Sequence, residues 1–101
     1  MIKKSRQEIE IDFMRAMNQA QELDEIASSM VQLAGEHVDN TMAILKSSFK
    51  GDNGAAFCKK GEGLRLELLD AADDLVKVAK SIRQTADIVY RAEKASVGIF
   101  G

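Results

Sequence analysis

Residues Ser47 to Phe57 read "SSFKGDNGAAF" and interrupt a sequence that otherwise has the pattern of continuous helix. Gly51 stands at the centre of this stretch and is followed by "DN", residue types that permit a reversal of the backbone and the start of a new helix. An aromatic residue lies on each side, Phe49 before the glycine and Phe57 after it. The stretch therefore predicts a turn near the middle of the chain, between two helices.

The composition of the chain favours helix on both sides of this turn. The 101 residues include no Pro, and 46% are hydrophobic and 30% charged, which is typical of a single foldable domain rich in helix formers. The net charge of −2 argues against a nucleic-acid-binding surface. A single Cys and a single His imply no internal disulfide, metal site or cofactor. We expect an all-α protein that is not an enzyme, since no nucleophile and base occur together.

Small and apolar residues recur at intervals of four and three through the first half, from Ile9 to Ser48. This spacing predicts a helix whose seam, which includes His37, stays against a neighbouring helix. Ser5 and Glu8 have the spacing of a capping box at its start. We therefore expect a helix over about 6–48 and a turn over about 49–52.

The same spacing defines the second half, from Leu64 to Ala92. It predicts a helix over about 53–94 and a flexible tail over 95–101, so that the whole chain is one antiparallel helical hairpin. Two glycines in "GEG", Gly61 and Gly63, fall inside this helix. They indicate either a close contact between helices or a later helix start.

A second apolar stripe lies beside the first on each predicted helix. Two stripes per helix are what a four-helix bundle needs, one facing the hairpin's own second helix and the other facing another hairpin. We therefore expect the hairpin to pair into a four-helix bundle, as a homodimer or heterodimer. The residues assigned to this partner interface are Leu69, Ala72, Val76 and Ala79 on the second helix, with Met42 and Leu45 on the first.

The turn carries a recognisable arrangement of residues. Phe49-Lys50-Gly51 stands at the turn of a hundred-residue helical pair, and Gly54 and Phe57 follow it. This resembles the W-x-G family of small type VII secretion proteins, the early-secreted-antigen-like hairpins, with Phe in place of Trp. The resemblance implies that Phe49, Gly51 and Phe57 form a turn and secretion motif. On the residues alone, the two aromatics also serve as a plug that closes the apolar end of the helices.

The resemblance also directs attention to "YRAEK" late in the second helix. The family has a Tyr followed four residues later by an acid, whereas here position 94 is Lys and the acid, Glu93, lies three residues after Tyr90. Both spacings place the acid on the same helix face as the tyrosine. Three interpretations stay open: a variant secretion signal, a subunit that travels with a partner carrying the full signal, or a tyrosine at the rim of the second stripe.

The function implied by the resemblance is non-enzymatic. The protein is expected to be exported as a folded dimer, or to serve as chaperone and targeting partner of a toxin with a helical N-terminal domain of the LXG type, with a secretion ATPase as a further partner. In a head-to-tail pair of hairpins, the turn of one protomer is expected near the Tyr90 end of the other. The alternative is a cytoplasmic coiled-coil adaptor or structural bundle subunit without an export role.

The beginning of the sequence bears on localisation. "MIKKSRQEIE" has no apolar run behind its basic residues, so it lacks the pattern of a secretory signal peptide. No segment approaches the roughly 18 apolar residues of a membrane span. We expect a protein that is cytoplasmic before export and then secreted, or held at the cell envelope, without a cleavable signal peptide.

Overall fold

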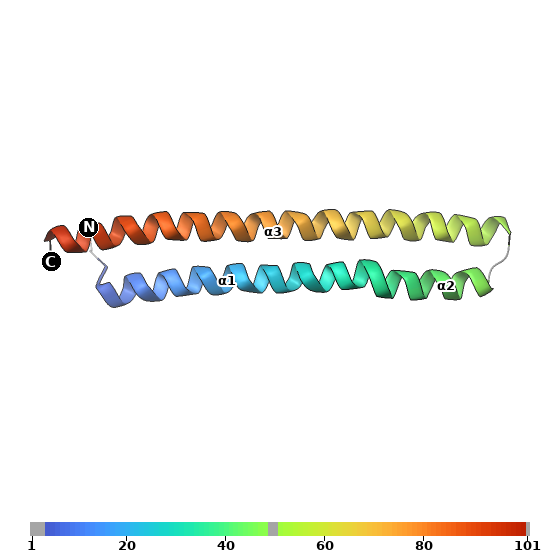
Figure 1. Ribbon diagram of the computed structural model, residues 1–101, viewed down its shortest axis with the longest axis horizontal. Coiled ribbons are helices and arrows are strands. Elements are labelled where there is room, and N and C mark those ends of the chain that lie inside the picture. Colours follow the sequence, from blue (N-terminus) through green and yellow to red (C-terminus); the bar gives the residue numbers. More distant parts are fainter. Residues whose placement is uncertain (1–3, 49–50, 101) are drawn as a thin grey trace. The chain divides into compact units, whose positions relative to one another are not determined.

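The computed structural model describes residues 4–48 and 51–100, with side chains described up to residue 97 (Figure 1). These residues form helices and contain no strand, which confirms the predicted all-α class. The elements in chain order are helix α1 (Arg6–Gln32), a π-helical turn (Leu33–His37), helix α2 (Val38–Ser48) and helix α3 (Asp52–Phe100).

The chain divides into two compact units. The terminal unit comprises Met1–Asp24 and Val76–Gly101, and the turn unit comprises Glu25–Leu75. Each unit contains two helical segments from opposite halves of the chain, as Figure 1 shows.

Contacts within each unit establish the direction of its helices. In the terminal unit Glu10 bonds to Tyr90 and Asp24 bonds to Arg83, so residue numbers fall on α3 as they rise on α1. In the turn unit α2 and α3 follow one another across a short connection. Both pairs are therefore antiparallel, which confirms the helical-hairpin character predicted from the sequence.

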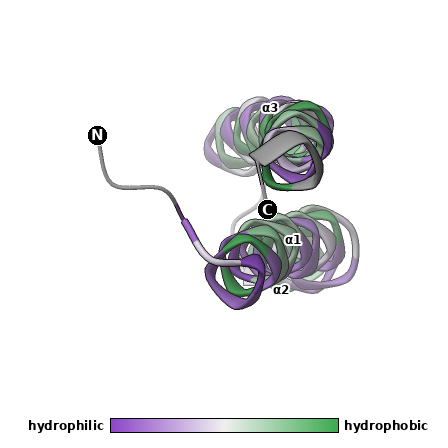
Figure 2. Ribbon diagram, turned by 90° about the vertical axis from the view of Figure 1, so that its left-hand side faces the viewer, coloured by the Kyte–Doolittle hydropathy of each residue, from purple (hydrophilic) through white to green (hydrophobic). Residues whose placement is uncertain are grey.

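Small side chains form the buried core. Alanines recur at intervals of seven on the buried face of each half, and none of the described side chains larger than alanine is fully buried. Viewed end-on, hydrophobic and hydrophilic segments alternate around each helix (Figure 2). Because alanine adds only a methyl group, it allows two helices to approach near the lower end of the usual separation of about 8–10 Å. The buried hydrophobic residues in the described ranges are Ile9, Ala20, Ala27, Ala34, Val38, Ala72 and Ala79.

The start of α3 depends on Gly51. This glycine has a φ of 78°, in the left-handed region that side chains disfavour, and no other described residue has a positive φ. Its carbonyl accepts a hydrogen bond from the Ala55 N–H at 3.2 Å, which places Gly51 at the cap of a helix beginning at Asp52. Phe49, the first aromatic of the predicted motif, lies outside the described residues.

The π-helical turn at Leu33–His37 changes which side chains of the first half are buried. One extra residue in a helical turn rotates the helix that follows by about 100°. The predicted seam continues from Ala34 to His37 and Thr41, but both of these are exposed. Val38 is buried in their place, at 7% exposure. The extra residue therefore moves the buried face of α2 by one position.

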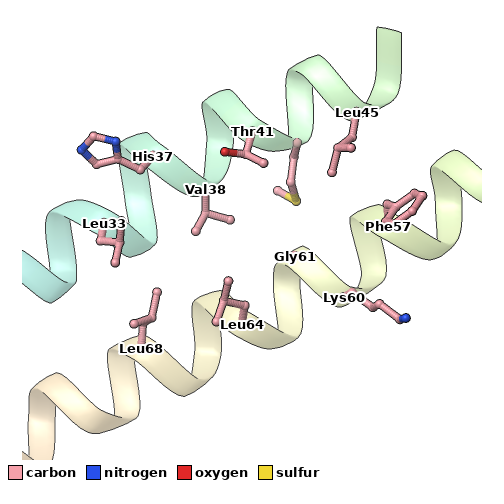
Figure 3. A pocket seen from close by; sticks show the side chains of 11 residues that line it. Leu33, His37, Val38, Thr41, Leu45, Phe57, Lys60, Gly61, Leu64 and Leu68 are labelled. Atoms are coloured by element: carbon pink, nitrogen blue, oxygen red, sulfur yellow. The ribbon is translucent and has the colours of Figure 1, made fainter. Parts of the chain in front are cut away.

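After the extra residue, the apolar spacing resumes through Val38, Met42 and Leu45. Met42 packs over the backbone of Gly61, because a Cβ at Gly61 would lie 2.6 Å from Met42 Sδ. Leu45 points toward Phe57 of α3 (Figure 3). The sequence assigned Met42 and Leu45 to an interface with a partner, whereas the structure places both side chains against α3 within the turn unit.

On α3 the buried face lies between the two stripes that the sequence defines. Ala72 and Ala79 are buried within the chain, at 2% and 0% exposure, although we expected them to face a partner. Leu64 and Val78 were expected to face the first helix, and about half of each side chain is exposed. Side-chain size explains the difference, since helices come closest along a line of alanines and larger residues then flank the contact.

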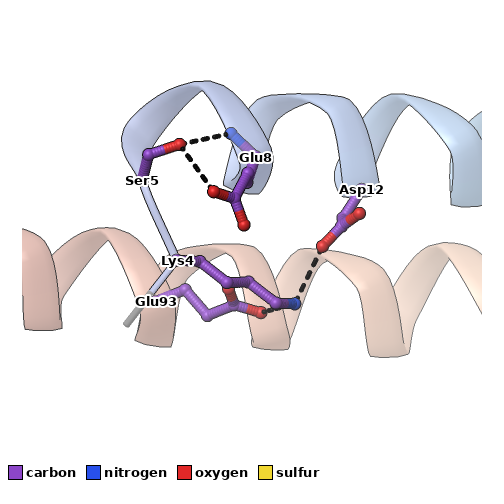
Figure 4. Close-up of polar contacts among 5 residues, drawn as sticks. All are labelled: Lys4, Ser5, Glu8, Asp12 and Glu93. Atoms are coloured by element: carbon purple, nitrogen blue, oxygen red, sulfur yellow. Dashed lines mark hydrogen bonds and ion pairs between the residues drawn. The ribbon is translucent and has the colours of Figure 1, made fainter. Parts of the chain in front are cut away.

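The first helix begins where the sequence predicts. Ser5 Oγ accepts a hydrogen bond from the Glu8 N–H at 3.1 Å and donates one to the Glu8 carboxylate at 3.3 Å (Figure 4). The Ser5 carbonyl accepts from the Ile9 N–H at 3.0 Å. The bond from the Glu8 N–H satisfies one of the N–H groups that a helix start otherwise leaves without partners. Ser5 is therefore the N-cap, and the Glu8 carboxylate turns back to the Ser5 hydroxyl and not to its backbone N–H as in a full capping box.

The end of α3 differs from the prediction. The sequence predicts a flexible tail over 95–101, but α3 continues to Phe100. The segment contains no Pro, and each residue added to an existing helix gains one hydrogen bond without a new nucleation cost. Val97 is partly buried, which gives this last part of the helix a packing contact.

Deleting Gly35 tests whether the π-helical turn is an accommodation of one extra residue. The deletion shortens the interval from Ala34 to Val38 to three, so an ordinary α-helix would bury the same side chains. It also removes a helix-interior glycine, which costs about 1 kcal/mol relative to alanine. We expect the melting temperature, followed by circular dichroism, to rise by about 4–8 °C.

Deletion of the exposed Ser28 is the matched control. It removes one residue from an interval of seven between Ala27 and Ala34 and puts the alanines out of phase. We expect that variant to melt well below the unaltered protein. Equal destabilisation by the two deletions would contradict the proposed role of the π-helical turn.

Candidate functional sites

The first candidate site surrounds Tyr90 in the terminal unit. The Tyr90 hydroxyl donates a hydrogen bond to the Glu10 carboxylate at 2.7 Å. Lys94 Nζ donates to the same carboxylate at 3.2 Å and to the Tyr90 hydroxyl at 3.3 Å. The Tyr90 ring also packs against Phe13, with ring centroids 4.4 Å apart and planes inclined by 31°. Tyr90 is therefore held by α1 on both its polar and its apolar side.

Glu93 is engaged in the same way, one turn further along α3. Lys4 Nζ lies 3.2 Å from the Glu93 carboxylate and 2.8 Å from the Asp12 carboxylate (Figure 4). The Glu93 side chain retains 25% of its exposure. Lys4 thus bridges an acid on each helix at the point where the chain enters α1.

These contacts change the charge equilibria of the terminal unit. The hydrogen bond from Tyr90, followed by that from Lys94, lowers the pKa of Glu10. The hydrogen bonds to Tyr90 and Glu10 raise the pKa of Lys94. The bond to Asp12, followed by that to Glu93, raises the pKa of Lys4. Each of these shifts favours the charged form of the group, so the contacts are strongest when Glu10, Lys94 and Lys4 are ionised.

Tyr90 and Glu93 lie on one face of α3, as their spacing implies, and that face contacts α1. The surface at this end of the terminal unit is formed by the exposed parts of Tyr90 and Glu93 together with the residues that contact them, Glu10, Lys94 and Lys4. Access to the whole tyrosine requires the contact with Glu10 to open.

The lowered pKa of Glu10 predicts that the free energy of unfolding decreases in acid. A carboxylate with a lowered folded-state pKa contributes stability that is fully present above its ordinary pKa. This stability is lost as pH falls below that value and through the lower folded-state pKa. In Glu10→Gln this contribution is absent at every pH. We expect the variant to melt no more than about 4 °C lower at pH 7, because the group is exposed.

Melting curves of the two proteins from pH 7 to pH 3, measured by circular dichroism, should converge in acid. A difference that stays constant over this range would show that the ionisation of Glu10 does not stabilise the terminal unit.

The second candidate site is an apolar groove in the turn unit, between α2 with its preceding π-helical turn and α3 (Figure 3). Its volume is about 400 Å³, within the range of small-ligand and peptide-anchor sites. The lining carries no acidic side chain, and its charged or ionisable groups are Lys60 and His37, whose side chains point away from the centre (Figure 3). The lining residues are Leu33, His37, Val38, Thr41, Met42, Leu45, Phe57, Lys60, Gly61, Leu64 and Leu68.

Two irregularities of the helices meet at this groove. Leu33 and His37 come from the π-helical turn, and Gly61, which has no side chain, lies further along the groove opposite Met42. Of the two interpretations of "GEG", the close contact applies to Gly61, where Met42 occupies the space of a Cβ. Gly63 has open space beside it.

The remaining predicted site residues divide by exposure. Phe57 lines the groove and is 40% exposed. Leu69 and Val76 are exposed, as an interface residue of a free chain must be. Sequence reasoning missed the groove residues Leu33 and Lys60. The signal that points to Leu33 is the interval of four from Ala34 to Val38, where the preceding 4-3 spacing would have an interval of three. This interval does not point to Lys60, which lies on α3.

Other kinds of site are not found in the described ranges. No cluster of three or more His, Cys, Asp or Glu side chains there is placed to hold a metal ion. None of the described helices has the length and apolar content needed to cross a bilayer.

Comparisons with known proteins found no similarity. The chain matches no protein-family model, and neither the curated proteins nor the solved structures that were compared gave a match.

Proposed function

We propose that this protein is a non-enzymatic component of type VII secretion, exported as a folded dimer or acting as chaperone and targeting partner of a secreted toxin. Another helical hairpin, a second copy of this chain or the N-terminal helical domain of a toxin would be its direct partner, and a secretion ATPase would receive the complex. The protein would be made in the cytoplasm and released, or retained at the cell envelope, without a cleavable signal peptide.

The observation that carries the proposal is the large apolar surface left outside the core. Fourteen large hydrophobic side chains among the described residues are exposed, while the buried positions hold mostly alanine. Leu66, Ile44, Met14 and Ile88 are at least 60% exposed. Because apolar surface in water is unfavourable by about 25 cal/mol per Å², a free chain of this kind gains stability by covering it. Pairing with another hairpin through the face that carries Val76 would bury part of this surface.

The export part of the proposal rests on the turn and on Tyr90. Gly51 adopts the left-handed backbone that the glycine of a W-x-G turn would require, directly after Phe49-Lys50 in the sequence. Tyr90 and Glu93 share one face of α3. We propose that the aromatic turn of one chain and the Tyr90 edge of its partner supply the two halves of one recognition surface.

One observation favours a second function, that of a cytoplasmic coiled-coil adaptor or structural bundle subunit. Both groups of the proposed signal are engaged inside the terminal unit, Tyr90 with Glu10 and Glu93 with Lys4. In an adaptor these contacts would only fasten the ends of the two helices together. Genes for a secretion ATPase or a toxin beside the gene for this protein would favour the export function.

Export is tested by comparing cytoplasmic and medium fractions from cells that express variants. We expect Phe49→Ala and Tyr90→Ala each to abolish release of the protein, or of its toxin, because each removes half of the surface. Glu93→Gln should reduce release less. Tyr90→Phe is the matched control, since it keeps the ring against Phe13 and loses only the hydroxyl.

The cytoplasmic level and helicity of every variant need to match those of the unaltered protein. Undiminished release of both alanine variants would exclude the export surface and leave the adaptor function as the better account.

Pairing is tested with Val76→Glu. Val76 is 47% exposed on the free chain, so a charge there should leave the helices intact and disfavour an apolar interface. We expect the dissociation constant of the pair to rise by at least tenfold, measured by analytical ultracentrifugation. Loss of helicity in proportion to the loss of pairing would mean that Val76 belongs to the core of the hairpin itself.

A further inference from the structure

The groove in the turn unit has the features of a site kept for an occupant. A π-helical turn is rare in globular proteins and is frequent at functional sites, and a helix-interior glycine costs about 1 kcal/mol relative to alanine. Both irregularities line the same groove: the π-helical turn places Leu33 and His37 on one wall, and Gly61 lies on the other, where Met42 packs over its backbone. The groove that they line has a volume of about 400 Å³.

The groove also has a defined charge character. Its walls are apolar and include Leu33 and Leu64, which are 44% and 51% exposed. Lys60 lies at its edge, and no carboxylate is among the lining residues. A complementary occupant would therefore present large apolar side chains with an acidic group beside them.

The chain itself carries such a surface on the opposite side of α3. At 100° per residue, Leu66 lies about 200° around the helix from Leu64. Leu66, Leu69 and Asp70 are spaced by three and one, so they are neighbours on the helix surface. All three are exposed, and we call them the acidic stripe.

We propose that the groove of one chain binds the acidic stripe of a second copy of the same chain, with Leu66 and Leu69 entering the groove and Asp70 facing Lys60. The donor and acceptor surfaces lie on opposite sides of one helix. Such a contact is heterologous, so it adds chains in one direction and does not close at two. It shares Leu69 with the face that carries Val76, so the two contacts compete for that residue, and it holds whether or not the protein is exported.

The contact is small, and the apolar part supplies most of its affinity. An exposed ion pair adds little, and its role is to select the partner surface. The test is sedimentation velocity of the full chain from about 10 μM to about 1 mM, a range suited to weak interfaces. We expect the weight-average mass to keep rising with concentration, with no plateau at two chains.

Apolar variants locate the contact. Leu64→Glu places a charge in the groove and Leu66→Glu places one on the acidic stripe, at a residue outside the Val76 interface, and each should stop the rise in mass. Ile88→Glu is the control, because Ile88 is 68% exposed and lies in the terminal unit, outside both surfaces. Equal effects of all three changes would overturn the proposal, since they would indicate unspecific apolar association.

Charge exchange tests the orientation with two exposed residues, so folding is not at risk. Lys60→Glu and Asp70→Lys should each weaken self-association by about threefold to tenfold. An equimolar mixture of the two variants should regain the affinity of the unaltered chain, because every contact then joins opposite charges. A mixture as weak as its components, or a mass that stops at two chains at every concentration, would overturn the proposal.

Discussion

The close packing of alanine against a neighbouring helix is the constraint on which the rest of the structure depends. Ala20, Ala27 and Ala34 on one half, with Ala72 and Ala79 on the other, provide a buried line of methyl groups. Helices packed along such a line leave little room between them for large side chains, and Ile9 and Val38 are the larger members of the buried core. Large apolar residues are therefore displaced to the flanks, where they meet solvent in the free chain and are available to another polypeptide.

The sequence predicts this arrangement in outline. The interval of seven predicts the all-α class, while the local residues around Gly51 and Ser5 predict the turn and the helix cap. The spacing does not show which of the two apolar stripes on a helix packs against the other helix of the same chain. Ala72 and Ala79 were assigned to the outer stripe because hydrophobic pattern alone ranks alanine below leucine, whereas packing distance favours the smaller side chain.

The groove was missed for a related reason. A heptad pattern continued without interruption selects His37 and Thr41 after Ala34, and the same residues allow a second solution with one residue skipped. The second solution buries Val38 and places Met42 and Leu45 against α3, which is worth more than burying a histidine and a threonine. Backbone hydrogen bonding tolerates the skipped residue as a π-helical turn. The spacing of residues alone does not show whether burying Val38, Met42 and Leu45 is more favourable than burying His37 and Thr41.

The buried line of alanines also has a thermodynamic consequence for a chain studied in isolation. The heat-capacity change on unfolding, and the slope of stability against denaturant, both grow with the apolar area that unfolding newly exposes. Here much of the leucine, isoleucine and valine surface is already in water before unfolding begins. A lone chain would thus have a flatter stability curve and a shallower denaturant transition than a globular domain of the same length, and both would approach ordinary values only once a partner covers the flanks.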